Sequence, residues 1–161
     1  MSQEDWIKTL AGFVASTLGF LIALLVNTYV GWLREKKAYW VMLKAVEAEA
    51  IGNKVILNES FLRFYDSGIV IREFSLIAVS QYLSDQVFIN NADQSIIELL
   101  GAYVRTLRLA NAYREKAEHL LLDSQGKKSK DWLDGIVMFW GENLKQCGAM
   151  IDRVLKVANA S

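Results

Sequence analysis

Basic side chains recur at helical spacing in the second half of the chain. Residues three, four or seven apart share a helix face, and one such face in residues 92–123 is followed by a lysine-rich polar loop. The members that could pair with an anion are Arg105, Arg108, Lys116, His119, Lys127 and Lys128. Guanidinium and ammonium groups bind phosphate oxygens, so this set, the basic patch, is the predicted ligand-binding surface. The alternative is an ordinary solvated helix face.

Two charged residues lie on helix faces that are otherwise apolar. Arg114 shares a face with Leu107, and Glu49 shares a face with Asn53 on an earlier predicted helix. A buried charge without a partner is costly. We therefore predict that Glu49 and Arg114 form a buried polar pair that fixes the register of the two helices. The alternative for both residues is a role in ligand binding.

Signatures of catalysis are absent from the sequence. The chain has one histidine and one cysteine, Cys147, so it cannot by itself supply a multi-histidine or multi-thiolate metal site or an intrachain disulfide. Cys147 lies in the apolar stripe of the last predicted helix, which indicates an inert buried thiol. The sequence has no Gly-rich phosphate loop and no nucleophile elbow. We expect a protein that is not an enzyme, with no catalytic residue, metal or cofactor.

The elements that must position these residues begin with a long uncharged segment. Residues 9–33 contain no Asp, Glu, Lys, Arg or His. As a helix they would measure about 37 Å at about 1.5 Å per residue, enough to cross a hydrocarbon core of about 30 Å. Trp6 precedes the run, and Tyr29 and Trp32 lie near its other end, as suits two membrane interfaces. A signal peptide would be shorter and less acidic at its start, so we predict one transmembrane helix.

The charges beside this run predict its orientation. Residues 34–37 read Arg-Glu-Lys-Lys, and the positive-inside rule places such a flank in the cytoplasm. The expected organisation is an N-terminal tail and transmembrane helix in residues 1–37 and a cytosolic helical domain in residues 38–161. The expected location is the inner (cytoplasmic) membrane.

Small residues recur at every fourth position of the membrane segment. The stripe consists of Ala11, Ala15, Gly19, Ala23, Asn27 and Gly31. Small side chains let helix backbones approach each other in lipid, and an amide can form a hydrogen bond across the contact. We therefore expect Ala15, Gly19, Ala23 and Asn27 to mediate transmembrane association, either in a homo-oligomer or with a partner membrane subunit.

The remainder of the chain predicts an all-α fold in which the transmembrane helix continues into a small helical bundle. Proline is absent, and 53% of the residues are hydrophobic. We expect helices at residues 38–65, 74–83, 92–123 and 131–158, with a loop at residues 84–91 that ends on Asn91 as a helix N-cap. The formal net charge is zero and gives no argument for binding duplex nucleic acid.

This organisation resembles a membrane-bound effector of type III CRISPR systems. The resemblance rests on residues 9–33, the basic flank after them, the Glu49-x-x-x-Asn53 helix and the helical remainder. It is one of organisation and size, and it transfers no binding residue. It implies that a cytosolic domain binds cyclic tetra-adenylate, a cyclic oligoadenylate, and that the oligomer then breaches the membrane in antiviral defence. The basic patch would hold that ligand.

Two other classes of protein would also show one anchor, a helical domain and no catalytic motif. An accessory or structural subunit would anchor a larger membrane complex and bind no nucleotide. A holin-like or toxin protein would breach membranes without a ligand. The effector remains the leading hypothesis, with the lipid bilayer and further copies of the chain as its expected partners.

The small-residue stripe leads to a direct test. Replacing Gly19 with Ile should weaken assembly in membranes, because the larger side chain keeps neighbouring backbones apart. The measurement is the fraction of oligomer after cross-linking in membranes. An oligomer that assembles as well as the unsubstituted protein would show that this face does not mediate association.

Overall fold

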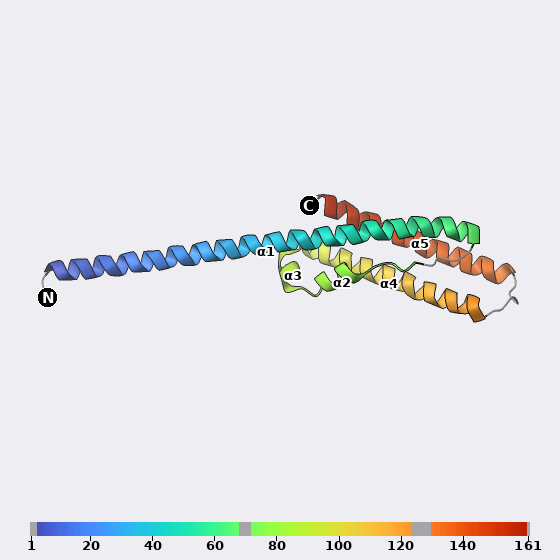
Figure 1. Ribbon diagram of the computed structural model, residues 1–161, viewed down its shortest axis with the longest axis horizontal. Helices are drawn as coiled ribbons and strands as arrows, with labels where there is room; N and C mark the ends of the chain where they lie inside the picture. Colours follow the sequence, from blue (N-terminus) through green and yellow to red (C-terminus); the bar gives the residue numbers. More distant parts are fainter. Residues whose placement is uncertain (1–2, 68–71, 124–129, 161) are drawn as a thin grey trace. The chain divides into compact units, whose positions relative to one another are not determined.

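Within residues 3–67, 72–123 and 130–160, which the computed structural model describes, every regular element is a helix, as the sequence predicts (Figure 1). The elements are α1 (Gln3–Ser67), α2 (Ile77–Tyr82), α3 (Gln86–Asn91), α4 (Gln94–Asp123) and α5 (Lys130–Ala160). The chain divides into two compact units, Met1–Ala38 and Tyr39–Ser161. Helix α1 contributes residues to both units.

The first unit contains the N-terminal part of α1. From Trp6 to Leu33 every large apolar side chain is exposed, and by length and composition this helix could cross a membrane. The hydroxyls of Thr17 and Thr28 donate to backbone carbonyls one turn earlier, at 2.8 Å each. These bonds satisfy two donors that lipid could not.

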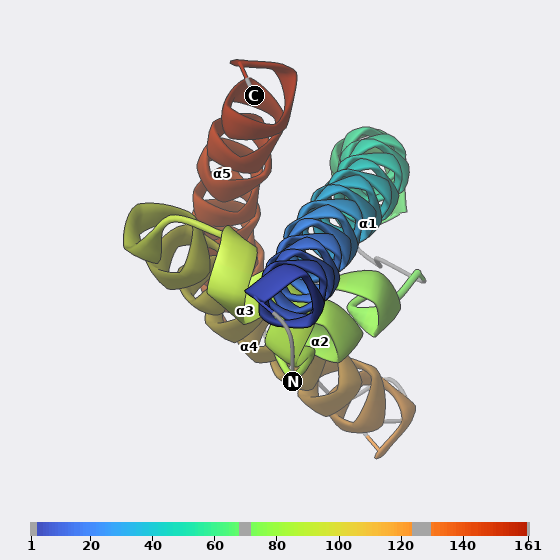
Figure 2. The ribbon, with the colours of Figure 1, turned by 90° about the vertical axis from the view of Figure 1, so that its left-hand side faces the viewer.

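The second unit has a core built mainly from the rest of α1, α4 and α5. Helices α4 and α5 run antiparallel side by side (Figure 1), and α2 lies against α4 (Figure 2). Core side chains recur three, four or seven residues apart, as expected for one buried face per helix. They include Tyr39, Leu43, Val46 and Leu57 of α1, Leu100, Tyr103 and Leu107 of α4, and Leu144, Cys147, Ile151 and Val154 of α5.

Residues 84–91, which the sequence analysis predicts as a loop, contain helix α3. Asp85 is its N-cap, because one carboxylate oxygen accepts from the amides of Val87 at 2.8 Å and Phe88 at 3.2 Å. Phe88 is completely buried in the core. Six residues are too few to show a helical period in the sequence, so the cap and one buried ring determine this element.

The predicted N-cap at Asn91 is also wrong. Asn91 is the last residue of α3, and its side-chain amide donates to the carbonyl of Val87 at 2.9 Å. Helix α4 begins at Gln94, and the Asp93 carbonyl accepts its first backbone bonds. The helix expected from residue 74 starts later as well, because α2 begins at Ile77.

Residues 72–76 cross between α1 and α2 without helical structure, and we call them the strap. Asn53 of α1 holds the strap from one side. Its Nδ2 donates to the Ser75 carbonyl at 2.8 Å and to the Tyr103 hydroxyl at 2.7 Å, and its Oδ1 accepts from the Ser75 amide at 2.8 Å. Asn53 is 1% exposed, so these bonds satisfy a polar side chain that water does not reach.

Asn111 of α4 holds the preceding strap residue in the same way. Its Oδ1 accepts from the Phe74 amide at 2.9 Å, and its Nδ2 donates to the Phe74 carbonyl at 2.9 Å. Successive residues of an extended chain direct their N–H and C=O groups to opposite sides. Two neighbouring residues are therefore bound by asparagines from two different helices, which fixes the strap between α1 and α4.

Asn53→Ala should destabilise the second unit. The substitution leaves the buried N–H and C=O of Ser75 without this partner, at a cost of about 3 kcal/mol in the free energy of unfolding. The measurement is denaturant unfolding of the full chain in detergent, followed by far-ultraviolet circular dichroism. Asn58→Ala is the matched control, because Asn58 is an exposed asparagine on the same helix. Equal stability of the two variants would contradict this account.

The thiol of Cys147 should resist alkylation until the protein unfolds. Burial raises its pKa to about 11, above the ordinary value of 9.0, so the neutral thiol persists at pH 8. Labelling by iodoacetamide should therefore be slow in the folded chain and fast in denaturant, as measured by mass spectrometry. Rapid labelling without denaturant would show that this part of α5 is accessible.

Candidate functional site

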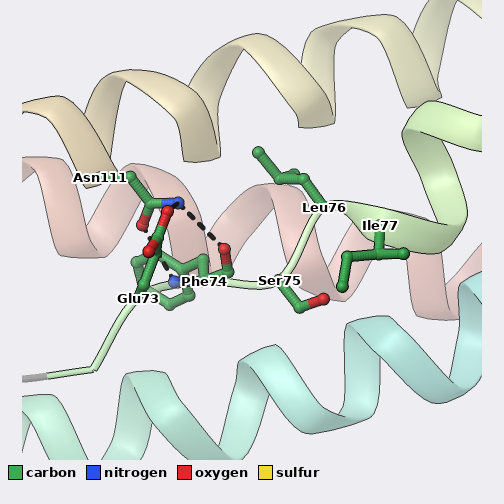
Figure 3. Close-up of a pocket in the computed structure, with 6 residues that line it drawn as sticks. All are labelled: Glu73, Phe74, Ser75, Leu76, Ile77 and Asn111. Atoms are coloured by element: carbon green, nitrogen blue, oxygen red, sulfur yellow. Dashed lines mark hydrogen bonds between the residues drawn. The ribbon is translucent and has the colours of Figure 1, made fainter.

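A groove runs along α4 where the strap and the start of α2 lie beside it. One hollow of about 460 Å³ is lined by Glu73, Phe74, Ser75, Leu76, Ile77 and Asn111 (Figure 3). An adjoining hollow of about 650 Å³ is lined by Glu73, Leu76, Arg108, Asn111, Ala112, Arg114 and Glu115. Glu73, Leu76 and Asn111 line both hollows, and we treat the two together as the α4 groove.

The strap forms one wall of the groove, and its position depends on the two asparagines. Figure 3 shows Asn111 reaching from α4 to the backbone of the strap beside Glu73. On the other side Asn53 fixes Ser75. Burial raises the pKa of the Tyr103 hydroxyl to about 12, so this group stays protonated at neutral pH beside Asn53.

Charged side chains gather in the larger hollow. Arg114 is 19% exposed, and its Nη2 lies 3.9 Å from Oε2 of Glu73, which is 65% exposed. The other oxygen of Glu73 lies 3.4 Å from Nδ2 of Asn111. Arg108 is exposed, and its Nη2 lies 3.5 Å from the Ser80 hydroxyl, at the outer limit of a hydrogen bond. The site thus combines two guanidinium groups with two carboxylates, those of Glu73 and Glu115.

The predicted basic patch is brought together only in part. Arg108 lines the groove, whereas Arg105 is exposed one turn earlier on α4 and is not among the lining residues. Lys116 and His119 belong to α4, but their side chains lie outside the described part of the chain. Lys127 and Lys128 lie outside the described residues altogether. The prediction that these side chains bind a ligand stays a prediction.

For Glu49 and Arg114, which were predicted to pair, the structure shows other contacts, and their pairing stays a prediction. The Glu49 carboxylate accepts from the amide of Ala78 at 2.6 Å, from that of Val79 at 3.4 Å and from the Ser75 hydroxyl at 3.2 Å. It thus caps the start of α2, whose own N-cap residue makes no side-chain cap bond. Arg114 Nη2 lies 3.9 Å from Oε2 of Glu73. The sequence did not indicate the contacts of Glu49, because they involve amides at the start of α2, which begins three residues later than expected.

The residues predicted to mediate membrane association are exposed on α1. Ala15, Gly19, Ala23 and Asn27 belong to the first unit, and no atom lies within 4 Å of a Cβ built at Gly19. A neighbouring backbone could therefore approach this face closely. Their role in association stays a prediction.

Sequence reasoning missed Asn111 and Glu73. Asn111 lies four residues after the buried Leu107 and one turn before Arg114, so it is a polar residue on a mostly apolar face. The same signal drew attention to Arg114 and would have found it. Glu73 has no such signal, because it is an exposed residue outside any helix.

The larger hollow presents guanidinium and amide donors beside two carboxylates. Guanidinium and amide groups donate hydrogen bonds to oxygen ligands. Among the described residues no group of His, Cys, Asp or Glu side chains could hold a metal ion. Comparisons of the chain with protein-family models, with curated proteins and with solved structures found no match.

Proposed function

We propose that this chain is an oligomeric single-pass membrane effector. Residues 9–33 would span the inner membrane, residues 38–161 would lie in the cytosol, and the helical domain would bind a cyclic oligonucleotide that leads the assembly to perturb or open the membrane in antiviral defence. The observation that carries this proposal is that a single helix, α1, contains both the membrane-length apolar run and the residues that hold the strap.

Three side chains at the basic end of the apolar run support the proposal that this run is a membrane anchor. The rings of Tyr29 and Trp32 stack with centroids 5.9 Å apart, and the Lys36 ammonium lies 4.2 Å from the centre of the Trp32 ring. Aromatic rings beside a cationic side chain are typical of the boundary between lipid and water. This arrangement would keep the basic flank at the cytosolic surface.

The α4 groove supports the proposal that the helical domain binds a ligand. It contains Arg108, a member of the predicted basic patch, and Arg114 in the same hollow. Guanidinium groups bind phosphate oxygens more specifically than ammonium groups do. In a symmetric oligomer each copy would contribute one groove, so a cyclic ligand with several phosphates could engage several copies at once.

A ligand can act on the membrane only if it binds one arrangement of the protein better than another. The strap offers a physical route for such a preference. Glu73, Phe74 and Ser75 line the groove, while Glu49 and Asn53 of α1 bind Ser75. A ligand that moves the strap therefore acts on residues held directly by the helix that would cross the membrane.

We expect cyclic tetra-adenylate to bind the full chain and to increase leakage from dye-loaded liposomes that contain it. Microscale thermophoresis in detergent measures the binding, and dye release measures the leakage. Gly19→Ile should reduce leakage without reducing binding, because the substitution lies in the anchor. Leu18→Ile is the control, an exposed apolar residue beside Gly19 but outside the stripe.

The absence of binding to the unsubstituted chain would overturn the proposed function. Leakage that does not depend on the ligand would favour a protein that breaches membranes on its own. Leakage that Gly19→Ile and Leu18→Ile reduce equally would remove the small-residue stripe from the mechanism.

A second function is favoured by one observation. Large apolar side chains lie exposed on α1 within the second unit, namely Trp40, Val41, Ile51 and Val55. Such exposed side chains are typical of a surface that another protein covers. An accessory subunit that anchors a larger membrane complex would therefore copurify with a different chain and bind no nucleotide.

A further inference from the structure

Glu73 occupies the position in the α4 groove where an anionic ligand would bind. One carboxylate oxygen faces Arg114 Nη2 at 3.9 Å, and the other faces Asn111 Nδ2 at 3.4 Å. Both distances are long for a charge-assisted contact, which is about 2.8 Å at its best. The carboxylate is mostly exposed, whereas Arg114 is mostly buried. The carboxylate is therefore the partner that can move into solvent, because it is mostly exposed and both of its contacts are long.

The charges that line the larger hollow balance only while Glu73 is present. Arg108 and Arg114 contribute two positive charges, and Glu73 and Glu115 contribute two negative charges. When the Glu73 carboxylate leaves, the hollow keeps one net positive charge, with Glu115 as the remaining acid. An incoming phosphodiester, with one negative charge, would restore the balance, and a phosphate monoester would bring a larger negative charge beside the two guanidinium groups.

The smaller hollow, of about 460 Å³, is mainly apolar. Phe74 and Leu76 line it with mostly apolar surface, and Ile77 is 77% exposed beside them. Covering such an exposed apolar side chain with a ligand removes apolar surface from water and stabilises the complex. The groove therefore presents a cationic end and an apolar end that share Leu76 and Asn111.

We propose that the α4 groove binds a phosphate ester, with its phosphate beside Arg114 and Arg108 and its apolar or aromatic part over Leu76 and Ile77. The phosphate takes the place of the Glu73 carboxylate, which acts as a competitor built into the chain. The inference deepens the proposed function, because it assigns the ligand site within the helical domain. It also lets the ligand act directly on the strap, since Glu73 precedes Phe74, whose backbone is bound by Asn111.

The test compares three single substitutions in the full chain in detergent. Glu73→Gln removes the competing charge and keeps the shape, so the affinity for adenosine monophosphate should rise about tenfold. Arg108→Gln should lower it about tenfold, because the phosphate loses a charged partner. Arg153→Gln is the matched control and should leave the affinity unchanged, since Arg153 is an exposed arginine of α5 that lines neither hollow and is not part of the basic patch.

All three substituted side chains are exposed, so the helical content measured by circular dichroism should not change. Isothermal titration calorimetry gives the affinities, with inorganic phosphate, adenosine and dihexanoyl phosphatidate as further probes. Tighter binding of adenosine monophosphate than of phosphate or adenosine supports a nucleotide source. Tighter binding of the phosphatidate supports a lipid headgroup. Both results support the site, provided that Glu73→Gln strengthens the binding of the probe and Arg108→Gln weakens it.

The two proposals fail in distinguishable ways. If cyclic tetra-adenylate binds equally well to the Arg108→Gln, Arg153→Gln and Glu73→Gln variants, the groove is not its site and the inference is overturned, while the proposed function stands. If adenosine monophosphate follows the expected order but cyclic tetra-adenylate does not bind, the groove is confirmed and the proposed function fails. Absence of binding by every probe to Glu73→Gln overturns the inference.

Discussion

The second unit depends on the way two asparagines bind a short stretch of backbone. Residues Phe74 and Ser75 lie between α1 and α4, where the core excludes water from much of their surface. A non-helical backbone in such a place needs partners for its N–H and C=O groups. Asn53 and Asn111 each supply a donor and an acceptor, so the N–H and C=O groups of Phe74 and Ser75 all have partners, although the described residues contain no strand.

Much of the fold could be predicted because long helices leave a periodic signal. The uncharged run, the absence of proline and the apolar stripes placed α1, α4 and α5 close to their observed positions. The short elements could not be placed in the same way. Helix α3 depends on the cap at Asp85 and on the ring of Phe88, and α2 depends on a carboxylate from a distant helix. Such tertiary contacts have no counterpart in local spacing.

The candidate site was predictable to the extent that its residues lie on helices. Arg108 and Arg114 stood out by their position on helix faces, and both line the groove. The sequence could not indicate the contact between Arg114 and Glu73, because it could not place the strap next to α4. Glu49 illustrates the reason: it was correctly identified as a polar residue on an apolar face, yet its partners are backbone amides that exist only once α2 has formed.

The position of the strap also depends on which atom each asparagine directs at a backbone carbonyl, because only the amide nitrogen can donate there. Deamidation would turn Asn53 or Asn111 into an aspartate, with an acceptor where the Nδ2 donor now faces a backbone carbonyl. Two oxygens would then oppose each other at the Ser75 or Phe74 carbonyl, and a negative charge would lie inside the helical domain. An aspartate at either position would therefore lose one of the two bonds that hold its strap residue.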